Sequence, residues 1–237
     1  MTTVGVPGDP NLEAVQSAFA ALGDLRESVV LVGGCATGLL VTATRSEMIR
    51  PTRDVDLVVE VVSARDFRRA EQRLRTCGFV NDQSAEAPIC RWRHGEIIVD
   101  LMPMTADILG FGNRWYPRAV ELADRVALPD GQSIRLVSAP VLLVTKFDAF
   151  RSRGQGDLLS SHDLEDVMTL IDGRVELEDE VAASPDDIRQ AIARECSDLS
   201  ADASLVEAMA GFLPGDPASQ GRLPELRARL ERLAGIQ

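Results

Sequence analysis

The chain has 237 residues, 45% of them hydrophobic, and a formal net charge of −12 at pH 7, which suits a soluble globular protein of one large domain or two small ones. This acidic balance argues against a general nucleic-acid coat protein, because contacts from basic side chains to phosphate supply most of that affinity. The sequence has no apolar run near the roughly 18 residues that span a bilayer, no signal-peptide pattern and no C-x-x-C pair, so we expect a cytoplasmic protein with reduced thiols and no membrane contact.

The first predicted elements are a helix, a strand and a second helix. Residues 11–22 have the apolar spacing of an amphipathic helix, and residues 29–32 are a continuous apolar run typical of a buried strand. This strand enters the pair Gly33-Gly34, and residues 35–44 follow as a short helix. The two glycines therefore lie at a helix N-terminus, where amide groups favour phosphate and the missing side chain permits a close approach.

A second strand, residues 55–61, carries two acids at its start. Asp54 and Asp56 are spaced i, i+2, so their side chains point to the same face and can jointly hold a divalent metal. Arg53 lies between the strand and the preceding loop and points to the opposite face. We expect it to be a structural ion-pair partner or a phosphate ligand.

An arginine-rich helix is predicted next. It covers residues 64–77, with Ser63 as its N-cap and Gly78 at its end. Its arginines are expected to form a solvated outer face, with an RNA-binding face as the alternative. They are Arg65, Arg68, Arg69, Arg73 and Arg75.

Two hairpins complete the first part of the chain. Residues 89–93 and 96–102 flank a His-Gly turn, and Asp100 lies within the second apolar run. Residues 125–128 and 133–137 flank a Pro-Asp-Gly turn. The order of strand, helix, strand, helix and hairpin predicts an α+β fold with a mixed sheet flanked by helices.

After the second hairpin the sequence predicts helices only, so we expect a catalytic sheet domain over residues 1–137 and a C-terminal helical domain over residues 138–237. A Gly-Gln-Gly loop at 154–156 and an acidic linker at 176–185 interrupt the helices. The predicted helices cover residues 139–151 and 161–171 and regions near 186–197, 201–213 and 223–235.

Three acids in this order are what metal-dependent nucleotidyl transfer requires. In that reaction a hydroxyl attacks the α-phosphorus of a nucleoside triphosphate (NTP) and pyrophosphate leaves, so acids for metal and amides or cations for phosphate suffice. Asp54 and Asp56 are predicted to be shared ligands of Mg²⁺ or Mn²⁺. Asp100 is predicted to hold the metal that activates the hydroxyl and to accept its proton. Gly33 and Gly34 are predicted to line the triphosphate.

These motifs resemble the DNA polymerase β nucleotidyltransferase superfamily. The resemblance rests on Gly-Gly, on Arg-Pro-Thr-Arg-Asp-Val-Asp-Leu (residues 50–57) and on a later strand with one Asp, and it covers residues 28–102 well. The motif at residues 50–57 is most similar to that of the AbiEii/MenT-like toxin nucleotidyltransferases. Cys35 stands where small antibiotic-modifying members carry a Ser. The resemblance implies a toxin-like enzyme that acts on RNA, such as tRNA, and a cognate antitoxin partner.

Lys146 is the only lysine among 25 basic residues. It is either an ordinary surface lysine in an arginine-biased chain or a position that needs a compact ammonium group. In the AbiEii-like proteins a lysine in the first helix after the sheet reaches the phosphates, which implies that role for Lys146. Arg153 follows seven residues later on the same helix face and is expected to assist in nucleotide binding.

Asp163 has two interpretations, which the sequence leaves open. The family shows a basic-Asp-x-x-Asp pattern at the start of the next helix, which His162 to Asp166 resembles, and this implies a nucleotide contact for Asp163. Ser160 and Asp163 equally fit a Ser-x-x-Asp capping box, which needs no substrate.

The residues therefore point first to an enzyme that transfers a nucleoside monophosphate (NMP) from NTP to an acceptor hydroxyl, with RNA as the expected acceptor. Modification of a small hydroxylated molecule such as an antibiotic is the second interpretation. The third is a catalytically silent nucleotide-binding or interaction module, which has no need of three acids at strand ends. His94, Trp92 and Trp115 are expected to be structural, with base stacking by Trp115 and Tyr116 as the alternative.

Overall fold

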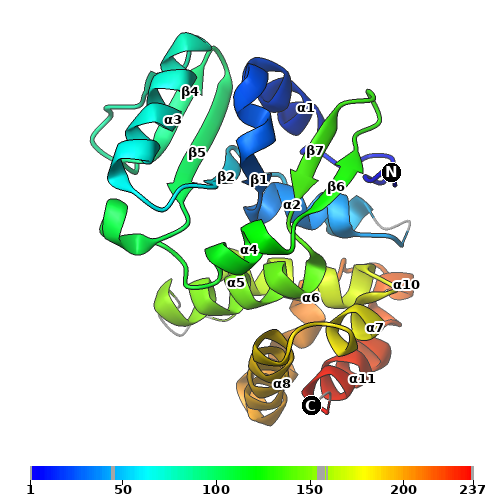
Figure 1. Ribbon diagram of the computed structural model, residues 1–237. Helices are drawn as coiled ribbons and strands as arrows, with labels where there is room; N and C mark the ends of the chain where they lie inside the picture. The colour runs from blue at the N-terminus through cyan, green and yellow to red at the C-terminus, as the bar shows by residue number, and fades with distance from the viewer. Residues whose placement is uncertain (1, 44–45, 154–157, 159, 236–237) are drawn as a thin grey trace.

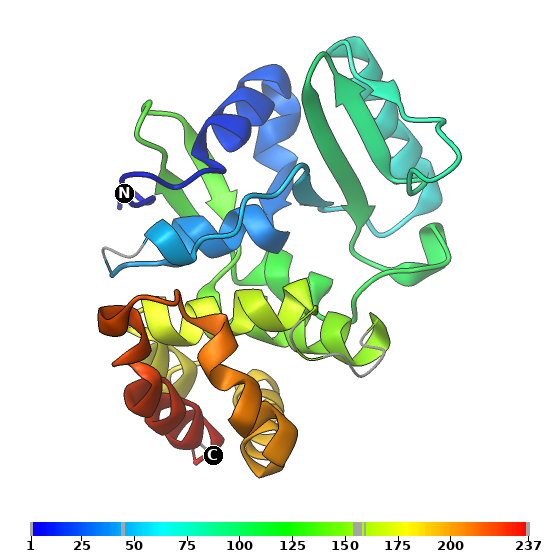
Figure 2. The same ribbon diagram turned by 180° about the vertical axis from the view of Figure 1, so that it is seen from behind.

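The structure is a computed structural model that describes residues 2–43, 46–153, 158 and 160–235. A mixed β-sheet with its helices forms the upper part in Figure 1, and a group of helices that begins with α5 (Ala139–Arg153) forms the lower part. The reverse view in Figure 2 shows the same two parts, and α2 (Gly33–Leu40) packs at their junction against α5 and α6 (His162–Gly173). This arrangement confirms the predicted α+β class with a helical C-terminal region.

The sheet has seven strands in the order β3-β4-β5-β2-β1-β7-β6. Both predicted hairpins are present, as β4–β5 and β6–β7, and the two predicted single strands are β1 and β2. A short edge strand, β3, was not predicted. The strands are β1 Val29–Leu31, β2 Val55–Val59, β3 Val80–Asn81, β4 Arg91–His94, β5 Ile97–Pro103, β6 Asp124–Ala127 and β7 Ser133–Leu136.

The centre of the sheet mixes parallel and antiparallel pairs. β2 pairs in parallel with β5, and β1 pairs antiparallel with β2 and parallel with β7. All three residues of β1 are buried, as their continuous apolar run predicts for a central strand. Parallel pairing of β2 with β5 places Asp56 directly opposite Asp100, so two acids far apart in the sequence become neighbours.

Four α-helices accompany the sheet. Ser63 caps α3 as predicted, because its Oγ accepts the Asp66 N–H at 3.1 Å. α2 ends at Leu40, before the predicted end at residue 44, because Val41 is extended and packs with Val6 and Ile49 in a small apolar cluster. The other helices of this part are α1 Leu12–Ala21, α3 Ala64–Thr76 and α4 Tyr116–Glu121, with 3-10 turns at Gly23–Ser28, Ser46–Met48 and Ala106–Ile108.

The helical part contains one helix where the sequence predicted an acidic linker. Leu177–Ala182 forms α7, because Leu177 and Val181 are fully buried and Glu178 forms ion pairs with Arg229 and Arg232. The predicted Gly-Gln-Gly loop lies outside the described residues. The remaining elements are α8 Asp186–Ala201, α9 Ala203–Ala208, a 3-10 turn at Met209–Phe212, α10 Pro217–Gln220 and α11 Leu223–Ala234.

One apolar core runs through both parts of the molecule. Its buried residues extend from Val15 in α1, through β1, β2 and β5, to Leu233 in α11. The helix α5 contributes to it along most of its length and packs against α2, α4, α6 and α8. Within the described part of the chain, no helix is both long enough and apolar enough to cross a bilayer.

Candidate active site

The three predicted acids lie together on two neighbouring strands. Asp54 immediately precedes β2 and Asp56 is the second residue of that strand, so the i, i+2 spacing directs both side chains to one face. Asp56 is in register with Asp100 of β5. Asp100 is buried, with 7% of its surface exposed, whereas the other two acids are partly exposed. A buried carboxylate needs a compensating cation or hydrogen-bond donors.

Arg91 supplies that compensation, and sequence reasoning missed it. Its Nε donates to Asp100 Oδ1 at 2.8 Å and its Nη2 donates to Asp100 Oδ2 at 2.7 Å. The same Nη2 also contacts Asp54 Oδ2. The hydrogen bonds that Arg91 donates to Asp100, together with the charges of Asp100 and Asp54, raise the pKa of Arg91 despite its partial burial, so its guanidinium stays charged and bridges two of the three acids.

The sequence did contain a signal for this contact. The predicted hairpin has a turn at Gly95, and a tight turn there fixes which residues of its two strands face each other. In the structure His94 pairs with Ile97, and counting back along β4 places Arg91 opposite Asp100. Opposite charges directly across an antiparallel pair attract one another, so the hairpin register alone indicates an Arg91–Asp100 pair.

Two features require a glycine at position 33, namely its backbone conformation and its close contact with Asp56. Its φ is +70°, which L side chains rarely adopt. A Cβ atom at Gly33 would lie 1.9 Å from Asp56 Oδ2 and 2.6 Å from the carboxyl carbon. The missing side chain therefore leaves room for the carboxylate of a predicted metal ligand. Val32 adds a second link between the two, since its N–H donates to the Asp56 carbonyl at 3.0 Å.

The first turn of α2 offers amide groups to the same region. Its N-cap residue is Val32, whose side chain cannot accept a hydrogen bond, so no side chain at that position satisfies the first amides of the helix. Gly34 lies in this turn and lines the cleft described below. Cys35 follows, but it is buried and its thiol donates to the Asp54 carbonyl at 3.4 Å. Burial, with nearby carboxylates, raises its pKa well above the ordinary value.

The segment before β2 is held in place by Asn11. Asn11 is almost fully buried, its Nδ2 donates to the Arg50 carbonyl at 2.9 Å, and its Oδ1 accepts the Thr52 N–H at 2.8 Å. Thr52 in turn donates from Oγ1 to Asp54 Oδ1 at 3.1 Å. The residue at the start of α1 therefore helps to position the first acid of the site, instead of capping its own helix.

Lys146 joins the helical part to this site. It is buried in α5, and its Nζ lies 2.6 Å from Asp166 Oδ2 and 3.1 Å from Asp163 Oδ1, both on α6. Burial alone would lower the pKa of Lys146, but Asp166, Asp163 and then Asp56 outweigh it, so the pKa is raised. The raised pKa keeps the amine charged at neutral pH, next to the two aspartates of α6 and in the same cavities as Asp56.

The capping-box interpretation of Ser160 and Asp163 requires Ser160 as the N-cap of α6, and Ser160 is not that residue. The N-cap of α6 is Ser161, whose Oγ accepts the Leu164 N–H at 3.3 Å. Asp163 therefore lies in the first turn, where its carboxylate pairs with Lys146. This position agrees with the interpretation of Asp163 as a nucleotide contact, which stays a prediction.

These residues line two adjoining cavities. Asp56, Lys146 and Asp163 line both of them, together with Met102 and Phe111. The larger cavity, of about 670 Å³, also contacts Gly34, Arg50, Thr52, Asp54, Pro88, Cys90, Arg91, Asp100, Ser160, Ser161 and His162. The smaller, of about 370 Å³, also contacts Val32, Gly33, Gly112, Asn113, Tyr116, Thr145, Asp148, Ala149 and Ser152. We refer to the two together as the cleft; it lies between the sheet and helices α5 and α6.

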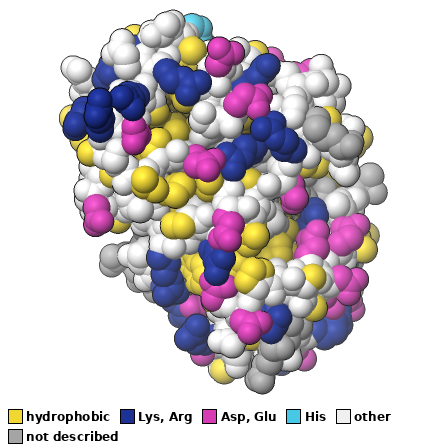
Figure 3. All heavy atoms as spheres, in the orientation of Figure 1, with side chains coloured by type: hydrophobic (Ala, Val, Ile, Leu, Met, Phe, Trp, Pro, Cys, Tyr) yellow, Lys and Arg dark blue, Asp and Glu magenta, His cyan; other side chains and the backbone are white. Residues whose placement is uncertain are grey.

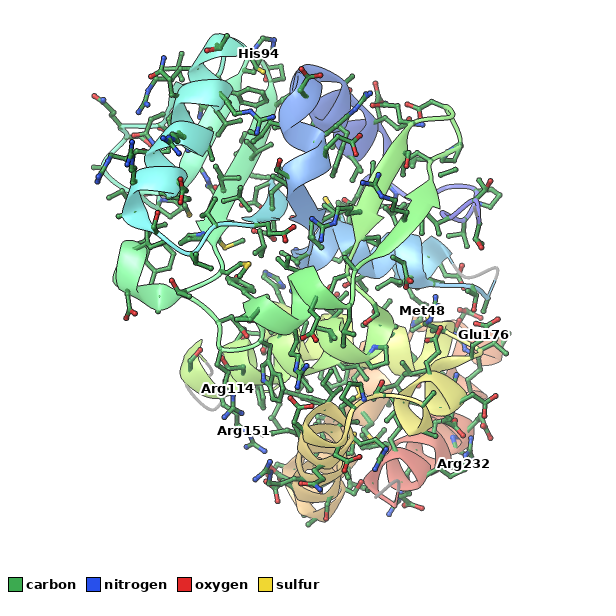
Figure 4. All side chains as sticks on the ribbon, in the orientation of Figure 1. Met48, His94, Arg114, Arg151, Glu176 and Arg232 are labelled. Atoms are coloured by element: carbon green, nitrogen blue, oxygen red, sulfur yellow. The ribbon has the colours of Figure 1, made fainter. Side chains whose placement is uncertain are left out.

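Other residues considered from the sequence lie away from the cleft or cannot be placed. His94 lies at the turn of the first hairpin, at the top of Figure 4, where it packs against Phe79 with ring centroids 5.2 Å apart. Trp92 is fully buried and its ring lies 4.8 Å from the Arg75 guanidinium carbon. Arg153 ends α5, and its side chain lies outside the described part of the chain.

The acid cluster has a suitable donor set for a divalent metal, but the acids are not arranged as a ready-made metal site. Within the described ranges no group of three or more His, Cys, Asp or Glu side chains converges closely enough to hold an ion. Arg91 lies between Asp54 and Asp100 instead. Carboxylate oxygens from three positions are nonetheless the ligands that Mg²⁺ and Mn²⁺ prefer, so the residues present fit such an ion once Arg91 moves aside.

Comparisons with known proteins give several similar solved structures, including the following two. One is the antibiotic-resistance factor ANT(2'')-Ia, at 14% identity and a TM-score of 0.45 over 81% of this chain and 94% of that one. The other is a candidate nucleotidyltransferase from H. pylori, at 12% identity and a TM-score of 0.47 over 94% of this chain and 91% of that one. No family model and no curated protein matches. At such values the likeness decides nothing about substrate or acceptor.

Proposed function

We propose that the protein is a metal-dependent nucleotidyltransferase that moves an NMP from an NTP to an acceptor hydroxyl, releasing pyrophosphate. The observation that carries this proposal is the register of Asp56 with Asp100, which, with Asp54, puts three carboxylates beside the N-terminus of α2 in one cleft. Amides for phosphate and acids for metal are the two requirements of the reaction, and the larger cavity contains candidate groups for both, which supports the proposal.

The three acids, the two glycines and the lysine of the cleft then each have a role. Asp54, Asp56 and Asp100 would hold Mg²⁺ or Mn²⁺, and the ion would neutralise charge on the transferring phosphate. The amides of Gly33 and Gly34 bind the triphosphate at the start of α2. Lys146 presents its charge to the same phosphates.

The proton of the acceptor hydroxyl has one candidate base in this arrangement. Its oxygen forms a bond to the α-phosphorus as the bond to pyrophosphate breaks, and its proton passes to Asp100. Asp100 is the only one of the three acids that is nearly inaccessible to solvent. A carboxylate sheltered in this way keeps the transferred proton from exchanging freely with water.

We propose RNA, with tRNA as the first candidate, as the acceptor, and a cognate antitoxin as a partner. The arginines of α3 support an RNA contact, since all five are exposed and Figure 3 shows basic side chains gathered over that region. In a protein of net charge −12, exposed arginines provide a local surface that can bind phosphate, while the rest of the acidic surface repels nucleic acid.

The test is transfer of label from each α-³²P NTP to total RNA in the presence of Mg²⁺. Wild-type protein is expected to label RNA with at least one NTP, and Asp56→Asn to reduce labelling by about a thousandfold, roughly 4 kcal/mol of transition-state stabilisation. Asp24→Asn, at an exposed position in a 3-10 turn, is the matched control and should label RNA normally. Labelling of hydroxylated small molecules alone would replace RNA as acceptor, and equal labelling by Asp56→Asn would refute the site.

A further inference from the structure

Arg91 occupies a position that the proposed function requires for another cation. Its fork makes two hydrogen bonds to Asp100 and one contact to Asp54, from the neighbouring strand β4. Three carboxylates this close repel one another unless a positive charge lies among them. Arg91 supplies that charge from within the chain, so the acids can be held together before any ion or substrate arrives.

The Arg91 guanidinium competes with a metal ion for the same carboxylates, because it lies between Asp54 and Asp100 and contacts both. A divalent ion needs direct bonds to carboxylate oxygens at about 2.0–2.6 Å, and Arg91 covers both oxygens of Asp100 and one of Asp54. The cleft offers space into which the Arg91 side chain can move, because 22% of this side chain is exposed and it lines the larger cavity.

We infer that Arg91 is an internal counter-ion which holds Asp54 and Asp100 in place of a divalent metal and moves into the cleft when the metal binds. This inference rests on the proposed function, since it concerns the metal of that same site. The site is then in equilibrium between an arginine-closed and a metal-ready arrangement. The apparent metal affinity is the intrinsic affinity multiplied by the fraction of molecules in which Arg91 has left the acids.

Metal binding to the protein without nucleotide tests this directly. The variant is Arg91→Met, which keeps a long side chain and removes the charge, and binding is followed by the loss of the free Mn²⁺ electron paramagnetic resonance signal. The matched control is Arg93→Met, two residues along the same strand, because Arg93 pairs with Asp82 at 2.6 Å instead of with the acids of the site. Arg91→Met is expected to bind Mn²⁺ more tightly, on the order of tenfold or more, and Arg93→Met as wild type does.

Each other result has a defined meaning. If Arg91→Met binds Mn²⁺ equally or more weakly than wild type, Arg91 is a fixed part of the site and the inference is overturned, while the proposed function stands. If neither wild type nor Arg91→Met binds Mn²⁺ at millimolar concentrations, the inference and the metal dependence of the proposed function fall together. A fall of the metal-free melting temperature of Arg91→Met, restored by Mn²⁺, is expected as well and supports the counter-ion role.

A measurement on the wild-type protein covers the case in which Arg91→Met does not fold. In protein labelled with ¹⁵N at arginine Nε, the Arg91 resonance is assigned by its loss in Arg91→Lys. Titration with Mg²⁺ should move it from the position of a hydrogen-bonded guanidinium to that of a free one. A resonance that stays unchanged while Mg²⁺ binds would show that Arg91 does not yield its place.

Discussion

Single residues of this site differ in how well the sequence reveals them. Asp54, Asp56 and Asp100 could be found because strand periodicity and order along the chain indicate where strand-borne acids meet. Arg91 is bound to the same acids, yet nothing in its own neighbourhood marks it. Its role comes from a cross-strand partner, which only the hairpin register reveals. The predicted metal and phosphate roles of these residues stay predictions until ligand binding is measured.

Gly33→Ala should show whether the contact with Asp56 matters beyond the backbone. An alanine at a positive φ costs roughly 1–2 kcal/mol of folding free energy, and a Cβ atom 1.9 Å from Asp56 Oδ2 should add about 1–3 kcal/mol of overpacking. Urea unfolding measures the sum. The control is Gly95→Ala, because Gly95 has a φ of +58° but no atom within 4 Å of the added Cβ. If both variants lose the same stability, Asp56 moves aside freely and the close packing has no consequence.

The charge of Lys146 can be followed on its own, because it is the only lysine of the chain. Its pKa is raised above the ordinary 10.5, so its ion pairs stabilise the fold fully below pH 10.5, and this contribution is lost as pH rises through the folded-state pKa. In protein labelled with ¹⁵N-lysine, the single side-chain signal should titrate above pH 10.5. Asp166→Asn should lower the midpoint relative to wild type. A wild-type midpoint below 10.5 would mean that burial outweighs the carboxylates.

Whole elements were predicted best where a local signal fixes them. The cap at Ser63, the two hairpin turns and the apolar runs of β1 and β2 each determine their own structure, and all are present. The errors arose where a distant contact decides. The acidic segment α7 is a helix because Arg229 and Arg232 of α11 neutralise its Glu178, and pairing across helices cannot be seen in a local composition.

Boundaries were also less predictable than the elements themselves. α2 stops at Leu40 because Val41 leaves the helix to pack with residues from two other segments. α6 begins at His162 with Ser161 as its N-cap, one residue later than a Ser160 cap would place it, and the two adjacent serines cannot be told apart as caps from the local sequence. The position of this helix start matters for the site, because Asp163 then lies in the first turn of α6, where its carboxylate pairs with Lys146.

At the scale of the whole molecule, the division at residue 137 stays a prediction. The chain does change there from mixed elements to helices, but one apolar core contains residues of both parts. Polar contacts also cross the junction. Arg174 Nη1 donates to the Leu40 carbonyl at 2.7 Å, and the Thr42 N–H donates to the Gly173 carbonyl at 3.0 Å. Such extensive contact favours a single cooperative unit over two domains that fold independently.

Unfolding monitored by two probes should decide between these possibilities. Trp92 and Trp115 both lie in the sheet part, so their fluorescence reports that part, whereas circular dichroism reports chiefly the helices. Leu230→Ala removes a buried side chain of α11, 1% exposed, and should lower the stability by about 2–5 kcal/mol. If the molecule is one cooperative unit, the fluorescence and circular dichroism midpoints in urea should shift together, although α11 is far along the chain from either tryptophan.

The control is Arg227→Ala, at an exposed position of the same helix, which should change stability by less than about 0.5 kcal/mol. A fluorescence midpoint that is unchanged in Leu230→Ala would show instead that the sheet part is stable by itself, as the boundary at residue 137 predicts, and that Lys146 reaches the acids from a separately folded domain.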